Sequence, residues 1–122
     1  MIGYVCLGTS DLERATRYYD ALLAPMGGKM LMDFGRGRAW GTAPDQPMVS
    51  VVLPFDGQPA HPGNGMMTAL MCSSKAQVDA QYKLAIDLGG TDEGPAGARG
   101  EGFYGGYFRD LDGNKLCFCF FG

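Results

Sequence analysis

The chain has 122 residues, of which 46% are hydrophobic and 19% are charged. A chain of this length buries roughly two thirds of its unfolded surface, so one domain over 1–122 with a real core is expected. Ten Lys and Arg against 13 Asp and Glu give a formal net charge of -3, which offers no basic footprint for nucleic acid or an anionic membrane. No apolar run approaches the roughly 20 residues that span a bilayer. We therefore expect a cytoplasmic protein with no nucleic-acid partner and no membrane partner.

The first half of the sequence predicts a strand, a helix and three further strands. The opening apolar run leads into the capping box Ser10-Asp11-Leu12-Glu13, where the serine side chain is expected to cap a helix of about fifteen residues. The pair Gly27-Gly28 then supplies a left-handed helix end. Apolar runs separated by turn residues predict the next three strands, over residues 29–34, 38–43 and 48–55.

The second half repeats this plan after a connector at about 56–65 that is rich in proline and glycine. A shift of 63 positions places Tyr4 opposite Met67 and the first helix opposite a second one, which Ser74 and Gln77 are expected to cap. A poorly defined strand is expected somewhere in 91–101, and apolar runs on either side of the turn Asp110-Leu-Asp-Gly-Asn114 predict strands over 103–110 and 115–121. Two βαβββ modules are therefore expected, at about 1–55 and 66–122.

Three motifs carry a resemblance to a known superfamily: TSDLERATRYY at residues 9–19, PGNG at 62–65 and GYFRDLDGNKL at 106–116. Together with the repeated βαβββ plan, they resemble the vicinal oxygen chelate superfamily, which includes glyoxalase I, bleomycin resistance proteins and extradiol dioxygenases. The resemblance covers the whole chain. It implies an α+β fold in which two modules form a concave mixed-sheet half-barrel, with a small organic ligand inside the concavity, and it implies a homodimer.

The resemblance also implies where a divalent metal would be held. Members that do chemistry use His, Gln or Glu from the first and last strands of each module, which leaves coordination positions open for substrate oxygens. Here those positions fall on Tyr4, Met67 and Cys117, and the strand around 49–51 offers only Ser50 as a polar group. The usual ligand types are absent from these positions, so a degenerate metal site and no cofactor are expected.

Candidate cleft residues follow from the same strands, because alternate residues of a strand share one face. A phenol or an indole adds an apolar body with one polar tip, although core packing explains each of the aromatic candidates equally well. The predicted cleft residues are Tyr4, Cys6, Trp40, Met67, Tyr104, Tyr107, Cys117 and Cys119.

The sequence Cys117-x-Cys119 is open to more than one interpretation. Thiolates and thioethers are soft ligands, so a Cu(I) or Zn site is one hypothesis and a redox pair is another. Buried cysteine usually behaves as a small hydrophobe, so apolar lining of the cleft by free thiols is favoured. Same-face positions of a strand lie about 6.6 Å apart, which argues against a disulfide between these two residues.

Three further polar side chains have a functional and a structural interpretation. His61, the single histidine, lies in the connector, where a turn or rim residue is more common than a catalytic base. Arg36 and Arg38 flank a predicted hairpin turn. They can attract an acidic ligand, although exposed arginines at such turns are ordinarily just solvated.

These observations favour a protein that binds a small organic molecule in an apolar cleft without metal catalysis. The alternative is a metal-dependent lyase or isomerase resembling lactoylglutathione lyase, or a dioxygenase-like enzyme, with a divalent metal held by other ligands. Whether the protein is an enzyme stays open at this point, and no catalytic residue is assigned.

Overall fold

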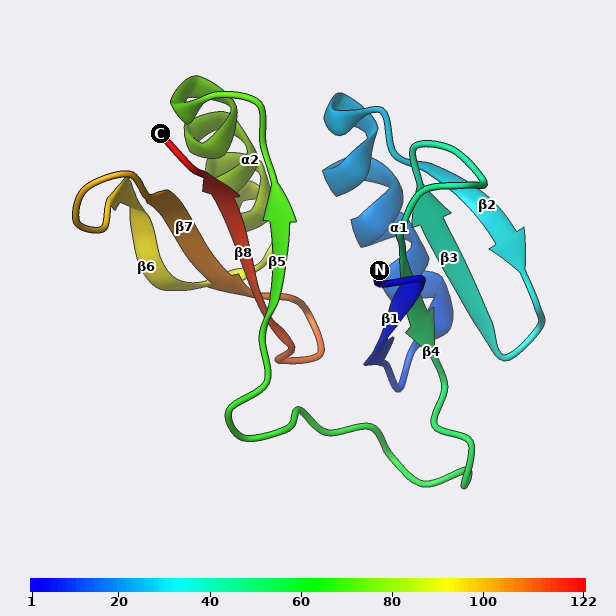
Figure 1. Ribbon diagram of the computed structural model, residues 1–122. Coiled ribbons are helices and arrows are strands. Elements are labelled where there is room, and N and C mark those ends of the chain that lie inside the picture. Colours follow the sequence, from blue (N-terminus) through cyan, green and yellow to red (C-terminus); the bar gives the residue numbers. More distant parts are fainter. The chain divides into compact units, whose positions relative to one another are not determined.

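A computed structural model describes all residues from Met1 to Gly122. The chain divides into two compact units, Met1–Pro62 (unit 1) and Gly63–Gly122 (unit 2). The division falls inside the connector expected at about 56–65. No helix is both long enough and apolar enough to cross a bilayer. Each unit consists of one helix and one four-stranded sheet (Figure 1).

Unit 1 has the element order predicted for the first module. Its elements are β1 (Tyr4–Gly8), α1 (Leu12–Leu23), the short 3-10 helix η1 (Ala24–Met26), β2 (Lys29–Asp33), β3 (Gly37–Gly41) and β4 (Met48–Val52). The strand order in the sheet is β1-β4-β3-β2. The β1 strand runs parallel to β4, and the other neighbours are antiparallel. The sheet is therefore mixed, with one parallel and two antiparallel strand pairs.

Unit 2 repeats this topology. Its elements are β5 (Thr68–Met71), α2 (Lys75–Asp87), β6 (Thr91–Ala98), β7 (Tyr104–Arg109) and β8 (Lys115–Phe120). The strand order is β5-β8-β7-β6, with β5 parallel to β8. The α+β class and the two βαβββ modules are thus confirmed, and neither sheet closes into a barrel.

The helix starts are predicted correctly for α2 and one residue early for α1. Ser74 caps α2, since its side chain accepts a hydrogen bond from the Gln77 backbone N–H at 3.1 Å. The cap of α1 is Asp11, whose side chain accepts from the backbone N–H of Arg14 at 3.0 Å. The Ser10 hydroxyl instead accepts from the backbone N–H of Ala60 at 3.0 Å. Serine and aspartate are comparable caps, so sequence pattern alone does not choose between two adjacent candidates.

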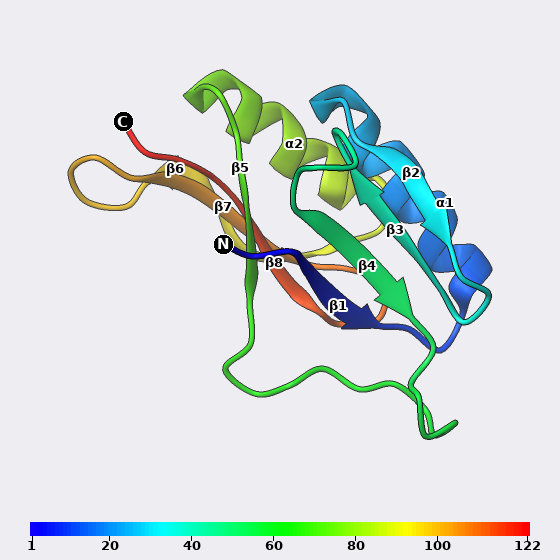
Figure 2. The same ribbon diagram turned by 45° about the vertical axis from the view of Figure 1, so that its right-hand side comes forward.

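In unit 1, α1 lies against one face of the sheet (Figure 2), and the buried side chains of the core lie between them. Trp40 of β3 is 1% exposed, its ring centroid lies 5.8 Å from that of Tyr19, and its indole N–H donates to Asp20 at 2.7 Å. Two residues earlier in the strand, Arg38 donates to the Thr16 hydroxyl at 2.8 Å. Both side chains therefore point toward α1.

The core of unit 2 lies between α2 and its sheet. Phe108 and Phe118 on neighbouring strands are fully buried and stack with centroids 5.3 Å apart. Gly106 lies directly under α2, where an added Cβ would be 3.0 Å from the Tyr82 side chain. The predicted turn after β7 is confirmed: the Asp110 carboxylate accepts from the backbone N–H groups of Asp112 and Asn114, each at 2.9 Å.

The cap of α1 gives a first test. Asp11→Ala should lower the free energy of unfolding by about 1 kcal/mol, because a helix N–H loses its acceptor. The fluorescence of Trp40, the only tryptophan, reports the unfolding of unit 1 in a urea titration. Asp45→Ala is the matched control, since it removes the same charge from an exposed loop position. An equal loss in both variants would contradict the assignment of the cap.

Candidate ligand-binding cleft

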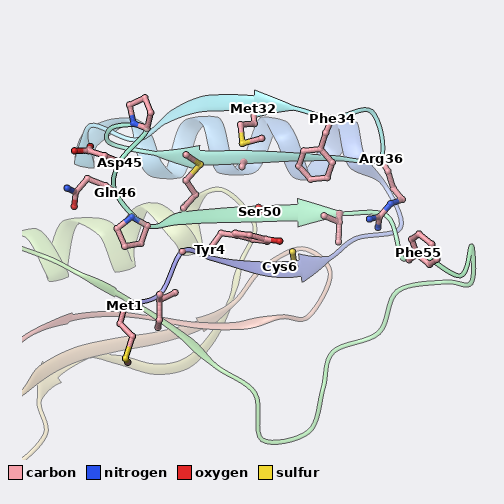
Figure 3. A pocket seen from close by; sticks show the side chains of 17 residues that line it. Met1, Tyr4, Cys6, Met32, Phe34, Arg36, Asp45, Gln46, Ser50 and Phe55 are labelled. Carbon is pink, nitrogen blue, oxygen red and sulfur yellow. The ribbon is translucent and has the colours of Figure 1, made fainter.

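Unit 1 holds a cleft of about 1080 Å³ on the sheet face turned away from α1 (Figure 3). Arg38 and Trp40 point toward α1, so the intervening Ala39 must project from the opposite face. Ala39 lines the cleft, as this alternation requires. The helix face of the sheet is thus the core, and the other face is the floor of the cleft.

The floor is a row of four side chains, one from each strand of the sheet. The pairing register places Cys6 beside Ser50, Ser50 beside Ala39, and Ala39 beside Met32. All four line the cleft, and Tyr4 extends the floor along β1. The row is mostly apolar, with two thiol or thioether groups and one hydroxyl.

Ser50 is the polar group at the centre of this floor. The residue is only 3% exposed and lies on a central strand of the sheet. Its side chain lines the cleft, and its hydroxyl makes no hydrogen bond within the protein. A nearly buried hydroxyl without a partner costs free energy unless water or a ligand satisfies it.

The two ends of the cleft carry opposite charges. Figure 3 shows Arg36 and Phe55 at one end and Asp45 and Gln46 at the other. Arg36 donates to the Leu53 carbonyl at 2.7 Å, and its guanidinium carbon lies 5.4 Å from the centroid of the Phe55 ring. These contacts hold the guanidinium at the mouth of the cleft.

The predicted cleft residues of β8 lie on the face of the unit 2 sheet turned away from α2. Cys117 pairs with Tyr107, whereas the neighbouring Gly106 faces Tyr82 of α2. Cys117 and Cys119 are both buried, and the Cys119 thiol donates to the Met71 sulfur at 3.8 Å. Burial raises the pKa of Cys117 to about 11 and also raises the pKa of Cys119. Both cysteines are therefore neutral thiols at neutral pH.

The other predicted residues have three different surroundings. Tyr107 is flanked by cations, with Arg99 5.3 Å and Lys115 5.8 Å from its ring centroid. Met67, just before β5, is 45% exposed. Tyr104 donates its hydroxyl hydrogen bond to Asp79 of α2 at 2.6 Å. The prediction of Tyr104 as a residue of the concave face therefore needs correction, because Tyr104 reaches over the helix side of the sheet.

Trp40 needs the same correction. Its ring packs on Tyr19 and its N–H is satisfied by Asp20, so it belongs to the core between α1 and the sheet. Of the predicted residues, the unit 1 cleft contains Tyr4 and Cys6. Residues that sequence reasoning did not assign to a cleft include Met32, Ala39 and Phe55. Alternation along β3 indicates that Ala39 faces away from its neighbours Arg38 and Trp40. Which of the two faces lines the cleft depends on the register with β4.

The side chains present do not fit a hard divalent metal. No group of three or more His, Cys, Asp or Glu side chains is arranged to hold a metal ion. Of the family positions, Tyr4 offers a 68% exposed phenol, Met67 a thioether, and Cys117 a neutral thiol. Hard cations prefer carboxylate, carbonyl or water oxygens, and Ni or Fe also uses imidazole, so a set without carboxylate or imidazole is unsuited to them. A soft metal would have to displace the proton of a thiol whose pKa is raised.

Comparison with known proteins places the chain in a family. A family model described as the Glyoxalase/Bleomycin resistance protein/Dioxygenase superfamily matches residues 1–118. A glyoxalase/bleomycin resistance protein from Albidiferax ferrireducens T118 is 33% identical, with a TM-score of 0.92, covering 100% of this chain and 99% of that one. No curated protein matches the sequence.

More distant solved structures share the fold. A lactoylglutathione lyase from Agrobacterium tumefaciens is 20% identical with a TM-score of 0.72, covering 98% of this chain and 92% of its own. A glyoxalase-related enzyme from Fulvimarina pelagi is 22% identical with a TM-score of 0.77, covering 98% and 87%. The chain belongs to the glyoxalase/bleomycin resistance protein/dioxygenase superfamily.

The different exposure of the cysteines predicts their reactivity. Cys6 is exposed in the cleft, whereas Cys72, Cys117 and Cys119 are buried. Burial raises the pKa of Cys72 to about 11 as well, so at pH 8 neither it nor Cys117 carries much thiolate. Brief alkylation of the native protein with iodoacetamide at pH 8 should label Cys6 alone, as peptide mass mapping can check. Cys6→Ser should remove the rapid labelling, and all the remaining thiols should react in denaturant. Rapid labelling of Cys117 in the native protein would show that its neighbourhood is open.

Proposed function

We propose that this protein binds a small organic molecule in the unit 1 cleft and does so without metal catalysis. The observation that carries the proposal is the cleft itself: a mostly apolar hollow with one unpartnered hydroxyl on its floor, Arg36 at one end and Asp45 at the other. Ligand sites typically combine apolar walls with a few placed polar groups, in volumes of about 300 to 1000 Å³. The cleft, at about 1080 Å³, is slightly larger than that range, which suits an extended ligand.

The chemistry of the family metal positions supports binding over catalysis. A metal enzyme of this family needs donors that can hold a Lewis acid, whereas Tyr4, Met67 and Cys117 offer a phenol, a thioether and a neutral thiol. We infer that the metal site is degenerate and that the protein carries no cofactor. Binding of an apolar molecule needs only area removed from water and a few hydrogen bonds.

Metal content tests this proposal against the alternative, a metal-dependent lyase or isomerase related to lactoylglutathione lyase. Protein purified without chelators should contain Ni, Zn, Fe, Mn and Cu at far below one atom per chain when measured by plasma mass spectrometry. As a check on the soft-metal hypothesis, the Cys117→Ser/Cys119→Ser variant should take up no less Cu(I) than the wild type. Stoichiometric metal bound through oxygen or nitrogen would favour the enzyme instead.

Binding of an uncharged apolar probe tests the cleft. N-phenylnaphthylamine, which fluoresces when it leaves water, should bind the wild-type protein. Cys6→Trp should greatly reduce the signal, because an indole on the exposed floor position fills the cleft without entering the core. The matched control is Ala21→Trp, which adds the same indole to an exposed position of α1 on the other side of the sheet. Equal binding by both variants would rule out the cleft as the probe site.

The assembly and location of the protein are part of the same proposal. We propose a cytoplasmic homodimer, as members of the family commonly are. Exposed methionines and aromatic residues in both units, among them Met32, Phe34, Met66, Met71 and Phe121, support self-association. Sedimentation equilibrium should give about twice the chain mass of 13.0 kDa. A concentration-independent mass of one chain would contradict the dimer.

A further inference from the structure

The charged groups of the cleft are few and are arranged differently at its two ends. Arg36 is the only cationic side chain that lines the cleft, and Asp45 is the only anionic one. Figure 3 places them at opposite ends, with the apolar floor between them. A ligand that lies along the floor therefore meets the Arg36 guanidinium at one end and the Asp45 carboxylate at the other.

Arg36 makes no ion pair, in contrast to Arg38 and Arg109. Arg38 pairs with Glu13 at 2.9 Å, and Arg109 pairs with Glu93 at 2.6 Å. The partners of Arg36 are neutral: the Leu53 carbonyl and the Phe55 ring. A guanidinium has five N–H donors, so most of those on Arg36 stay available, and its positive charge is uncompensated.

Arg36 is also held in place before any ligand arrives. The hydrogen bond to Leu53 fixes one edge of the guanidinium, and the Phe55 ring lies against its face. A side chain that is already oriented loses less conformational entropy on binding. Asp45 lies on an exposed loop and makes no hydrogen bond or ion pair, so its position is less constrained.

We propose that the unit 1 cleft selects organic acids, with the anionic group of the ligand at Arg36 and its apolar or aromatic body over Ala39 and Met32. The planar guanidinium matches the geometry of a carboxylate or sulfonate. The body of the ligand covers the row from Cys6 to Met32 and brings a polar atom to the Ser50 hydroxyl. Asp45 at the far end repels an anion there, which fixes the direction of the ligand. This selectivity rests on the proposed binding function of the same cleft.

Two probes with the same aromatic body separate selectivity from binding. Anilinonaphthalene sulfonate carries an anionic group, and N-phenylnaphthylamine has the same rings without it. In low-salt buffer, Arg36→Gln should weaken binding of the sulfonate by about threefold to fivefold, the size expected for an exposed ion pair. Binding of the uncharged probe should not change. The effect should shrink at about 1 M salt, where the screening length falls to roughly 3 Å.

Two control variants identify the cause of any change. Arg17→Gln removes the same charge from the exposed side of α1 and should leave both affinities unchanged. Arg36→Lys keeps the charge and should retain part of the preference for the sulfonate. Equal weakening of both probes by Arg36→Gln would show a structural role for Arg36 and overturn the selectivity.

The outcomes also separate this inference from the proposed function. If the wild type binds both probes in the cleft and Arg36→Gln changes neither affinity, the selectivity for acids is wrong while the binding function stands. If the wild type binds neither probe, the binding function fails and the selectivity fails with it.

Discussion

One packing interaction determines the cleft: α1 lies against one face of the unit 1 sheet and turns the other face into a separate surface. A strand that runs parallel to its neighbour must be joined to it by a crossover, and here the chain between β1 and β4 begins with α1, which covers one face of the sheet. Once Tyr19 and Leu22 of α1 are buried against the sheet, every second residue of each strand belongs to the core. The residues between them, such as Cys6, Ser50 and Ala39, must project from the other side. The side chains that line the cleft are therefore decided by which alternate residues of the four strands face away from α1.

Much of this arrangement could be predicted from the sequence, because local signals set the order of the elements. The glycine pairs, the capping residues and the turn at Asp110 mark where elements begin and end, and the repeat fixes the common plan. Tyr4 is predicted as a cleft residue because the family resemblance puts a metal-ligand position there, and Cys6 follows because alternate residues of a strand share one face. The resemblance supplies the face, and alternation supplies the second residue.

The failures at Trp40 and Tyr104 have a common physical cause. Alternation tells which residues share a face, but pairing register decides which of the two faces meets the helix. Trp40 pairs with Val49, a core residue, and the indole finds an acceptor on α1. Tyr104 shares its face with Gly106, the residue on which α2 packs. An aromatic residue with a polar tip suits a ligand site and a contact with a helix equally well. The residue type therefore does not tell which of the two a Trp or Tyr makes.

The cysteines show how environment changes the chemistry of one residue type. Cys117 and Cys119 lie on the sheet face turned away from α2, yet neighbouring side chains bury them and burial keeps both thiols protonated. Cys6, at the corresponding level of unit 1, stays exposed in the cleft. The same residue type thus lies in different surroundings in the two units: buried beside other side chains in unit 2 and exposed in an open cleft in unit 1.

Arg36 and Arg38 show that environment also decides whether the charge of a side chain is compensated. Two residues apart in a strand, they would share one face, but β3 begins at Gly37 and Arg36 belongs to the preceding turn. Arg38 therefore extends to Thr16 and Glu13 of α1, where a carboxylate compensates its charge. Arg36 extends to Leu53 and Phe55 at the mouth of the cleft, where nothing does. The guanidinium of Arg36 therefore keeps free donors and an uncompensated charge at the mouth of the cleft, and the proposed selectivity for organic acids depends on this difference between two neighbouring arginines.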